Sequence, residues 1–129
     1  MSLAQKFATT FGGVYVLVGI VGFISFFGGT TDQTPSALLG IFGVTAVHNV
    51  VHLLVGFGFL AGAQNDRIAR LVSMTIGAVY TLVGVIGVLN LALVNDLLNI
   101  NLADNLLHFA TGLLALAVAF QGRRAAVTA

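Results

Sequence analysis

The chain has 129 residues, of which 58% are hydrophobic and only 7% are charged, and its formal net charge is +1. Soluble domains carry roughly a quarter charged residues, so this composition excludes an ordinary soluble fold and predicts helices that face lipid. Its five basic residues form no continuous patch, which argues against a nucleic-acid partner. The absence of cysteine excludes disulfides, thiolate metal sites and iron–sulfur clusters.

The first half of the chain contains two apolar stretches. The first covers about Ala8–Phe27 and is followed by a loop rich in Gly and Thr, with the single Pro of the chain. The second, residues 37–63, is longer than one membrane crossing needs. Thr45 is suited to cap a helix, so we expect the spanning helix to cover Ala46–Ala63 and Ser36–Val44 to lie at the membrane interface.

The second half contains two more apolar stretches. The third covers about Arg70–Val94, and the fourth covers about Asn101–Phe120. The predicted fold class is therefore all-α: one transmembrane domain over residues 1–129, built as a polytopic four-helix bundle.

The charged residues predict an orientation for these spans. Two loops on one side carry acidic residues and no basic ones, namely Asp32 and Asp96. All five basic residues lie on the other side: Lys6, Arg67, Arg70, Arg123 and Arg124. Because positive loops stay in the cytoplasm, we expect a multi-pass protein of the bacterial inner membrane with both termini cytoplasmic.

An internal repeat divides the chain into two units of about residues 8–63 and 70–121. Residues 12–22, GGVYVLVGIVG, match residues 77–87, GAVYTLVGVIG, at seven of eleven positions. The motif HNVVH at 48–52 matches DNLLH at 104–108. Each unit contributes two spans, so the two units have the same orientation, and we expect a pseudo-two-fold axis along the membrane normal.

The repeated motifs place six polar residues in the second and fourth spans: His48, Asn49, His52, Asp104, Asn105 and His108. Residues four apart share one helix face, so His48 and His52 lie together, as do Asp104 and His108. Ionisable side chains are unfavourable against lipid, so we expect both faces to point into the bundle and His52 to meet His108.

The expected helix starts give these residues a depth. Thr45 and Asn101 are equivalent positions and both are plausible N-caps. His48 and Asp104 then lie in the first helical turn near the outer surface, with Asn101 and Asp104 forming a capping box.

Several functions remain open for this cluster. The favoured one is structural: interhelical hydrogen bonds, each worth roughly 1 kcal/mol in lipid, join the two halves. The tetrad of His48, His52, Asp104 and His108 could instead bind zinc or another divalent metal. His52 and His108 could also be axial ligands of a haem or pigment. A small-solute or proton path through an oligomer is the last alternative.

Two tyrosines are also equivalent in the repeat. Tyr15 and Tyr80 complete the structural polar cluster with Asn49 and Asn105. We expect these tyrosines to form interhelical hydrogen bonds or to anchor the helices at the interface. The recurrent glycines predict close helix packing.

Residues 40–56, GIFGVTAVHNVVHLLVG, carry a family resemblance. Together with the later D-N-x-x-H at 104–108, they resemble the bacterial membrane-protein family catalogued as domain of unknown function 4383. That family has four apparent spans, an L-x-G-x-F-G-V lead-in and an H-N-x-x-H-L-x-x-G core. The resemblance covers about residues 7–120 and implies the architecture without a mechanism.

No phosphate loop, nucleophile triad or paired carboxylates can be identified, and Glu is absent. We therefore predict a non-enzymatic accessory or structural subunit of a membrane complex, with the lipid bilayer and a larger complex or a homo-oligomer as partners. Metal or haem/pigment binding by the cluster is the alternative function.

Overall fold

The computed structural model describes residues 1–127 and the side chains of residues 1–121. The regular secondary structure of the described residues is helical apart from one short hairpin. Its helices are α1 (Leu3–Val21), α2 (Ala46–Gly62), α3 (Asp66–Val88), α4 (Ala92–Leu98) and α5 (Leu102–Val127), with a 3₁₀ turn at Ser25–Phe27. The hairpin consists of the antiparallel strands β1 (Ser36–Leu38) and β2 (Phe42–Val44).

Three helices are long and apolar enough to cross a membrane: α1, α3 and the Leu102–Gln121 part of α5. Helix α2 is also apolar but has only 17 residues. Large apolar side chains are exposed along all four of these helices, among them Leu17, Leu54, Leu82 and Leu106. Such a surface is unfavourable in water and favourable in lipid, so the chain is a helical membrane protein.

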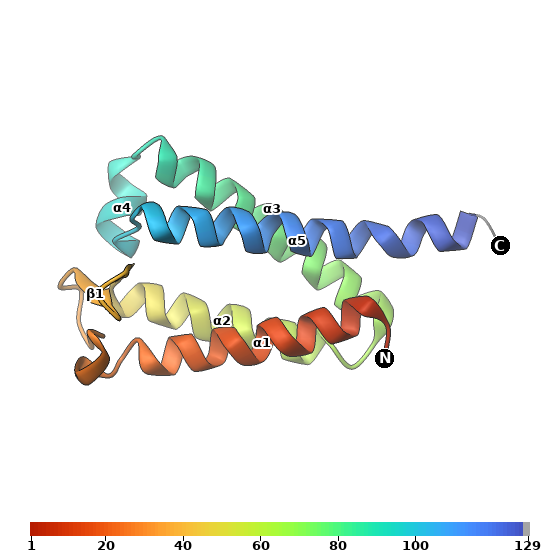
Figure 1. The fold of residues 1–129 in the computed structure, drawn as a ribbon, viewed down its shortest axis with the longest axis horizontal. Helices are drawn as coiled ribbons and strands as arrows, with labels where there is room; N and C mark the ends of the chain where they lie inside the picture. Colours follow the sequence, from red (N-terminus) through yellow and green to blue (C-terminus); the bar gives the residue numbers. More distant parts are fainter. Residues whose placement is uncertain (128–129) are drawn as a thin grey trace.

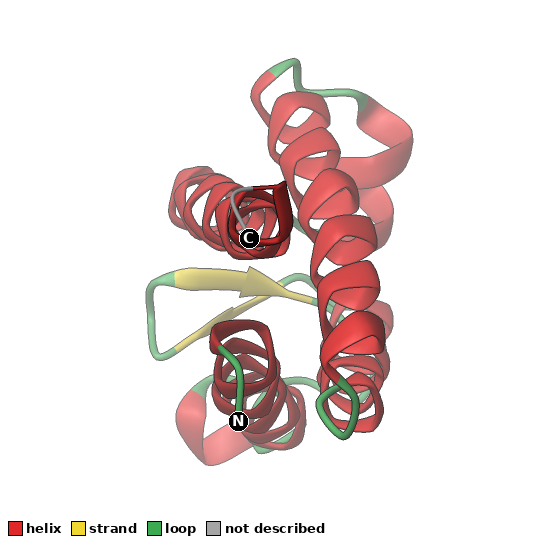
Figure 2. Ribbon diagram, turned by 90° about the vertical axis from the view of Figure 1, so that its right-hand side faces the viewer, coloured by secondary structure: helices red, strands yellow, loops and turns green. Residues whose placement is uncertain are grey.

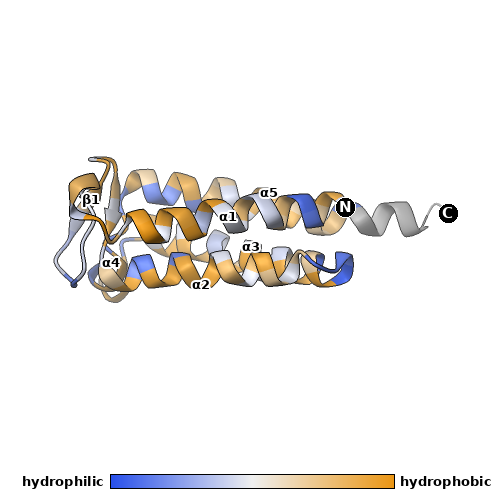
Figure 3. Ribbon diagram, turned by 90° about the horizontal axis from the view of Figure 1, so that it is seen from below, coloured by the Kyte–Doolittle hydropathy of each residue, from blue (hydrophilic) through white to orange (hydrophobic). Residues whose placement is uncertain are grey.

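The elements are arranged so that α1 begins and α5 ends at the same end of the molecule, while the hairpin and α4 lie at the opposite end (Figure 1). Helix α1 packs along α2, and α3 packs along α5. In the view along the helices, the hairpin lies between α1 and α5 (Figure 2). Apolar residues dominate the helices, and hydrophilic residues gather in the connections at the two ends (Figure 3).

Corresponding glycines allow close contact in the two helix pairs. A methyl group on Gly12 of α1 would meet Leu60 of α2 at 2.8 Å. A methyl group on Gly77 of α3 would meet Leu116 of α5 at 3.0 Å. The same offsets relate the buried positions Tyr15 and Tyr80. The α1/α2 and α3/α5 pairs therefore have matching interfaces as well as matching sequences.

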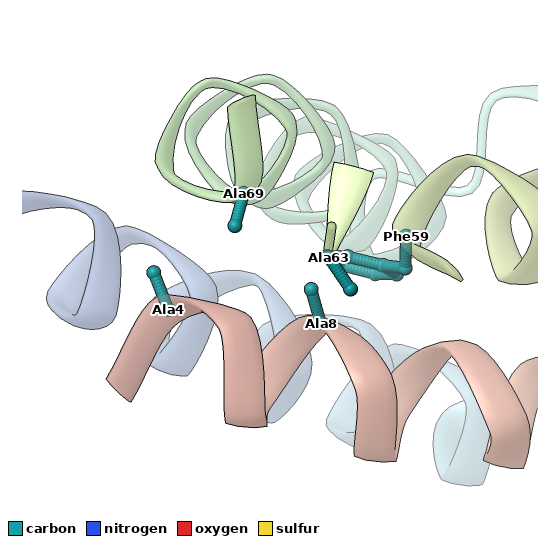
Figure 4. Packing of buried hydrophobic residues seen from close by; sticks show 5 residues of the cluster. All are labelled: Ala4, Ala8, Phe59, Ala63 and Ala69. Atoms are coloured by element: carbon teal, nitrogen blue, oxygen red, sulfur yellow. The ribbon is translucent and has the colours of Figure 1, made fainter. Parts of the chain in front are cut away.

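A small apolar core joins the pairs at the end where the chain starts. It contains Ala4 and Ala8 of α1, Phe59 of α2, Ala63 just after α2, and Ala69 of α3 (Figure 4). Alanine side chains let the helix backbones approach closely, and the single large ring of Phe59 fills the space between them.

The first helix differs from its predicted range of Ala8–Phe27. It begins at Leu3 because Ser2 and Gln5 form a capping box, in which each side chain accepts a hydrogen bond from the other's backbone N–H. It ends at Val21 because the carbonyl of Gly22 accepts hydrogen bonds from the Thr30 backbone and the Asn49 side chain. Hydropathy alone does not show that donors from outside the helix bind the Gly22 carbonyl, which a continued helix would use for its own hydrogen bond.

The predicted third helix, Arg70–Val94, is divided in the structure. Helix α3 begins at Asp66 because Asn65 caps it, and it ends at Val88. Asn90 then has a φ of 54°, a left-handed conformation that stops the helix before α4 starts. The range of the second helix was predicted within one residue, and the segment Ser36–Val44 before it forms the β1–β2 hairpin.

Candidate functional site

The polar cluster is positioned by the first turns of α2 and α5. Thr45 precedes α2 in an extended conformation, and its hydroxyl accepts a hydrogen bond from the His48 backbone at 3.2 Å. Asn101 precedes α5 and exchanges two hydrogen bonds with Asp104, at 2.9 and 3.1 Å. The predicted N-caps are thus present. His48 and Asp104 both occupy the third position of their helices, and their backbone N–H groups donate to the capping side chains.

Buried polar groups of the first half bind to the connection of the second half. The His48 Nδ1 lies 2.8 Å from the Leu98 carbonyl oxygen. The Thr45 hydroxyl donates to the Leu97 carbonyl oxygen, also at 2.8 Å. Both carbonyls belong to α4, so this short helix is tied to the start of α2.

The second half binds back to the first. The Asp104 Oδ2 accepts a hydrogen bond from the Gly43 backbone at 2.9 Å. Asn99 and Asn101 donate their side-chain amides to the carbonyl oxygens of Ser36 and Ile41, at 3.0 and 2.8 Å. The hairpin of the first half is therefore joined to the residues that precede and begin α5.

The two asparagines of the motif fit against glycines. Asn49 donates its amide to the Gly22 carbonyl oxygen at 2.6 Å and to that of Thr30 at 3.3 Å. A methyl group on Gly22 would overlap the Asn49 side chain, and one on Gly87 would overlap Asn105 in the same way. Each asparagine thus occupies space that only a glycine on the paired helix leaves free.

The three histidines lie together, all of them buried. Each of His48, His52 and His108 has one ring nitrogen that lies within 4.8 Å of a ring nitrogen of the other two. The ring of His48 lies 4.4 Å from that of His52 and 6.0 Å from that of His108, measured between centroids. The Nδ1 atoms of His52 and His108 are buried and have no hydrogen-bonding partner.

Asp104 is separate from this group, although the sequence predicted it as a fourth metal ligand. Its Oδ2 accepts two backbone hydrogen bonds, from Gly43 and Asn101, and the set of close ligand atoms contains only the histidines. The reason is the capping box, which turns the carboxylate back to the helix start. The predicted tetrad is therefore reduced to three histidines.

The tyrosines lie beside the histidines. The rings of Tyr15 and Tyr80 are 5.4 Å apart, and each is next to a histidine: Tyr15 lies 5.5 Å from His52, and Tyr80 lies 5.1 Å from His108. The Tyr15 hydroxyl donates to Thr111 at 3.0 Å, which is an interhelical hydrogen bond of the predicted kind. The buried Tyr80 hydroxyl makes no hydrogen bond of good geometry.

Sequence reasoning missed Thr111 and the backbone carbonyls of Leu97 and Leu98. Thr111 lies three residues after His108, on the same helix face, so helical periodicity could have identified it. The carbonyls carry no side-chain signal, because they depend on how α4 folds back over the cluster.

A small cavity of about 50 Å³ adjoins the histidines. It is lined by the three histidines, Tyr80 and apolar side chains of α2, α3 and α4. A single water occupies roughly 30 Å³ of the liquid, whereas organic ligands need about 300 Å³ or more. The cavity has room for an ion with a water, and a tetrapyrrole would need more space than this cavity offers.

Comparison with known proteins assigns the chain to a family. No curated protein and no solved structure matches it. One family model, described as a domain of unknown function, DUF4383, matches residues 5–121. In the described part of the chain, this range covers the three helices that could cross a membrane, except Leu3 and Ala4 at the start of the first, and the whole polar cluster. The chain therefore belongs to the DUF4383 family, as its H-N-x-x-H and D-N-x-x-H motifs suggested.

Proposed function

We propose that this chain is a non-enzymatic accessory subunit of a larger complex in the bacterial inner membrane. In this proposal it consists of two tandem two-helix units that form a four-helix bundle. The polar cluster joins the two units at their outer ends and gives the subunit one fixed shape to present to its partner. Lipid covers the remaining apolar surface.

One observation carries the structural role: the hydrogen bonds between the halves run in both directions. His48 of the first half binds the Leu98 carbonyl of the second, and Asp104 of the second half binds the Gly43 N–H of the first. Each bond is to a backbone group that would otherwise be left without a partner near the membrane. Loss of a side-chain partner there is therefore more harmful than the loss of an exposed hydrogen bond.

The tandem repeat is supported by the matching interfaces. The contacts of Gly12 with Leu60 and of Gly22 with Asn49 recur in the second pair at equivalent positions. The connectivity supports a fourth crossing, because α2 starts at the hairpin end and returns along α1 (Figure 1). Its 17 residues extend about 26 Å, slightly less than the apolar thickness of a bilayer, which local thinning can accommodate.

The cytoplasmic placement of the termini rests on the basic residues. Lys6 and Arg67 are exposed at the end where α1 begins and α3 begins, and Arg70 pairs there with Asp66 at 2.7 Å. The side chains of Arg123 and Arg124 lie outside the described residues. The opposite end carries Asp32, whose pKa is held below its usual range by hydrogen bonds from Thr34 and Thr30.

A non-enzymatic role fits the surroundings of the ionisable groups. In the described part of the chain, the hydrogen bonds of the Asp104 carboxylate go to backbone N–H groups and not to a histidine. His48 bonds to a carbonyl, which neither gives nor takes a proton during a reaction. This arrangement lacks the base and orienting acid of a nucleophile triad.

The proposal can be tested with a matched pair of substitutions. Asp104→Leu leaves the Gly43 and Asn101 N–H groups without an acceptor, whereas Asp96→Leu changes an exposed residue of α4. We expect Asp104→Leu to lower the free energy of unfolding by about 2 kcal/mol, because the bonds go to a charged group. Thermal unfolding in mild detergent, followed by circular dichroism, measures this difference.

The same samples test the accessory role. Wild-type protein and Asp96→Leu, extracted gently from native membranes, should migrate in assemblies well above the 13.3 kDa of the chain. Asp104→Leu should release the chain from them. A wild-type protein that extracts only as a monomer would contradict the accessory role, and an Asp104→Leu protein as stable as Asp96→Leu would contradict the joining role.

A further inference from the structure

Two histidines of the cluster contact neighbouring rings but make no hydrogen bond through Nδ1. His52 and His108 are 5% and 4% exposed, and their Nδ1 atoms have no hydrogen-bonding partner. A buried polar atom without a partner is unfavourable by roughly 1–3 kcal/mol. Two such atoms at equivalent positions of both units are unexpected in a purely structural cluster.

His48 is oriented as a ligand by its own hydrogen bond. A carbonyl oxygen only accepts, so the contact with Leu98 requires the proton to be on Nδ1 of His48. The Nε2 atom then keeps its lone pair. Metal-binding histidines commonly have this arrangement, in which one nitrogen donates to a backbone carbonyl and the other binds the ion.

We infer that His48, His52 and His108 bind one divalent transition-metal ion of the zinc type. Their nearest ring nitrogens lie within 4.8 Å of one another. In a tetrahedral site with zinc–nitrogen bonds of about 2.0–2.1 Å, the nitrogens are about 3.3–3.4 Å apart. Small side-chain rotations close the remaining gap. Neutral imidazoles suit zinc, copper, nickel or iron and do not suit magnesium or calcium.

The fourth position of the ion faces the adjoining cavity. Its volume of about 50 Å³ takes one water or hydroxide beside the ion. The Tyr80 hydroxyl, which makes no hydrogen bond of good geometry, lines the same cavity and can bond to this water. Asp104 lies one turn before His108 and offsets part of the charge of the ion without binding it.

The experiment uses the full chain, purified in detergent with a tag that contains no histidine and then stripped of metal. The sequence has only three histidines, all in this site, and no cysteine, so competing nitrogen and sulfur ligands are few. Cobalt(II) is the probe, because a tetrahedral site gives it strong visible absorption bands. We expect one cobalt per chain, displaced by one zinc.

Substitutions then identify the ligands. His52→Leu and His108→Leu should each weaken binding by 100-fold or more, since loss of a second-shell partner alone weakens binding 10- to 100-fold. Tyr15→Phe is the matched control: Tyr15 lies beside His52, but its hydroxyl bonds to Thr111. It should bind cobalt as the wild type does. Circular dichroism confirms that each variant is helical.

Two results would overturn the inference: a folded wild-type protein that takes up no stoichiometric cobalt or zinc, or folded His52→Leu and His108→Leu proteins that bind as tightly as Tyr15→Phe. The inference goes beyond the accessory role and is separable from it. Asp104→Leu tests the joining of the halves without removing a ligand, and the histidine variants remove ligands without breaking the bonds of Asp104.

Discussion

Single residues decide how closely the helices of each pair approach. Gly22 and Gly87 lie directly against the Asn49 and Asn105 side chains, and neither position has space for a methyl group. Gly13, one turn before Leu17, is different, because a methyl group there would meet no atom within 4 Å. Gly13 within α1 and Gly22 directly after its end therefore have opposite requirements.

This contrast gives a matched test. Gly22→Ala should destabilise the protein by about 1–3 kcal/mol, because the added methyl displaces the Asn49 amide from its carbonyl acceptors. Gly13→Ala should be neutral or stabilising by up to about 1 kcal/mol, because alanine favours helix more than glycine does. Thermal unfolding in detergent compares the two. Equal stabilities of the variants would show that the close contact is not required.

At the scale of elements, the outer connections do more than link helices. The β1–β2 hairpin and α4 each supply backbone groups to the opposite half. Helix α4 ends at Leu98, and the next residue, Asn99, has a φ of 54°, a left-handed conformation that asparagine and glycine tolerate best. The Asn99 side chain also bonds to Ser36 and Val44 of the hairpin, at 3.0 and 3.4 Å.

Two substitutions separate the backbone and side-chain roles of Asn99. Asn99→Gly keeps the left-handed backbone but removes the bonds to the hairpin, so we expect a loss of about 1 kcal/mol. Asn99→Ala should lose about 1 kcal/mol more, because its Cβ disfavours that conformation. Asn90→Gly is the control, since Asn90 has the same φ and is exposed, and its side chain accepts a hydrogen bond from Asn95 of the same half and not from the hairpin. Chemical denaturation measures all three, and an Asn99→Gly protein as stable as Asn90→Gly would refute the link to the hairpin.

At the scale of the whole molecule, the fold places basic residues at one end and exposed acidic residues at the other. Lys6 and Arg67 lie near the start of α1 and of α3, while Asp32 and Asp96 lie at the end with the hairpin and α4. The chain starts at the basic end. The positive-inside rule therefore predicts that the hairpin, and the end of the bundle that contains the polar cluster, face away from the cytoplasm.

The absence of native cysteine makes this orientation directly measurable. Thr31→Cys and Gln64→Cys place single thiols at exposed positions of the two ends. In intact spheroplasts, a membrane-impermeant maleimide should label Thr31→Cys at once and Gln64→Cys only after lysis. The reverse pattern would place the termini outside, and labelling of both in intact cells would exclude a crossing between them.

The family and the membrane character could be read from the sequence. The apolar stretches predicted helices that could cross a membrane, and the motifs at 48–52 and 104–108 predicted the family. The N-caps at Thr45 and Asn101 were also predictable, because a capping hydroxyl or amide acts within its own turn. These signals are local in the chain, which is why no tertiary information was needed.

The tertiary structure decided what each polar residue contacts. Asp104, predicted as a metal ligand, bonds instead to Gly43 from the other half, and His48 bonds to Leu98 of α4. The helix ends at Val21 and Val88 and the hairpin before α2 were likewise not predicted. These side chains bind backbone groups that are distant in the sequence, and hydropathy does not indicate which groups they are. The sequence by itself determined which polar residues interrupt the apolar stretches, and only the fold decided that the three histidines lie together.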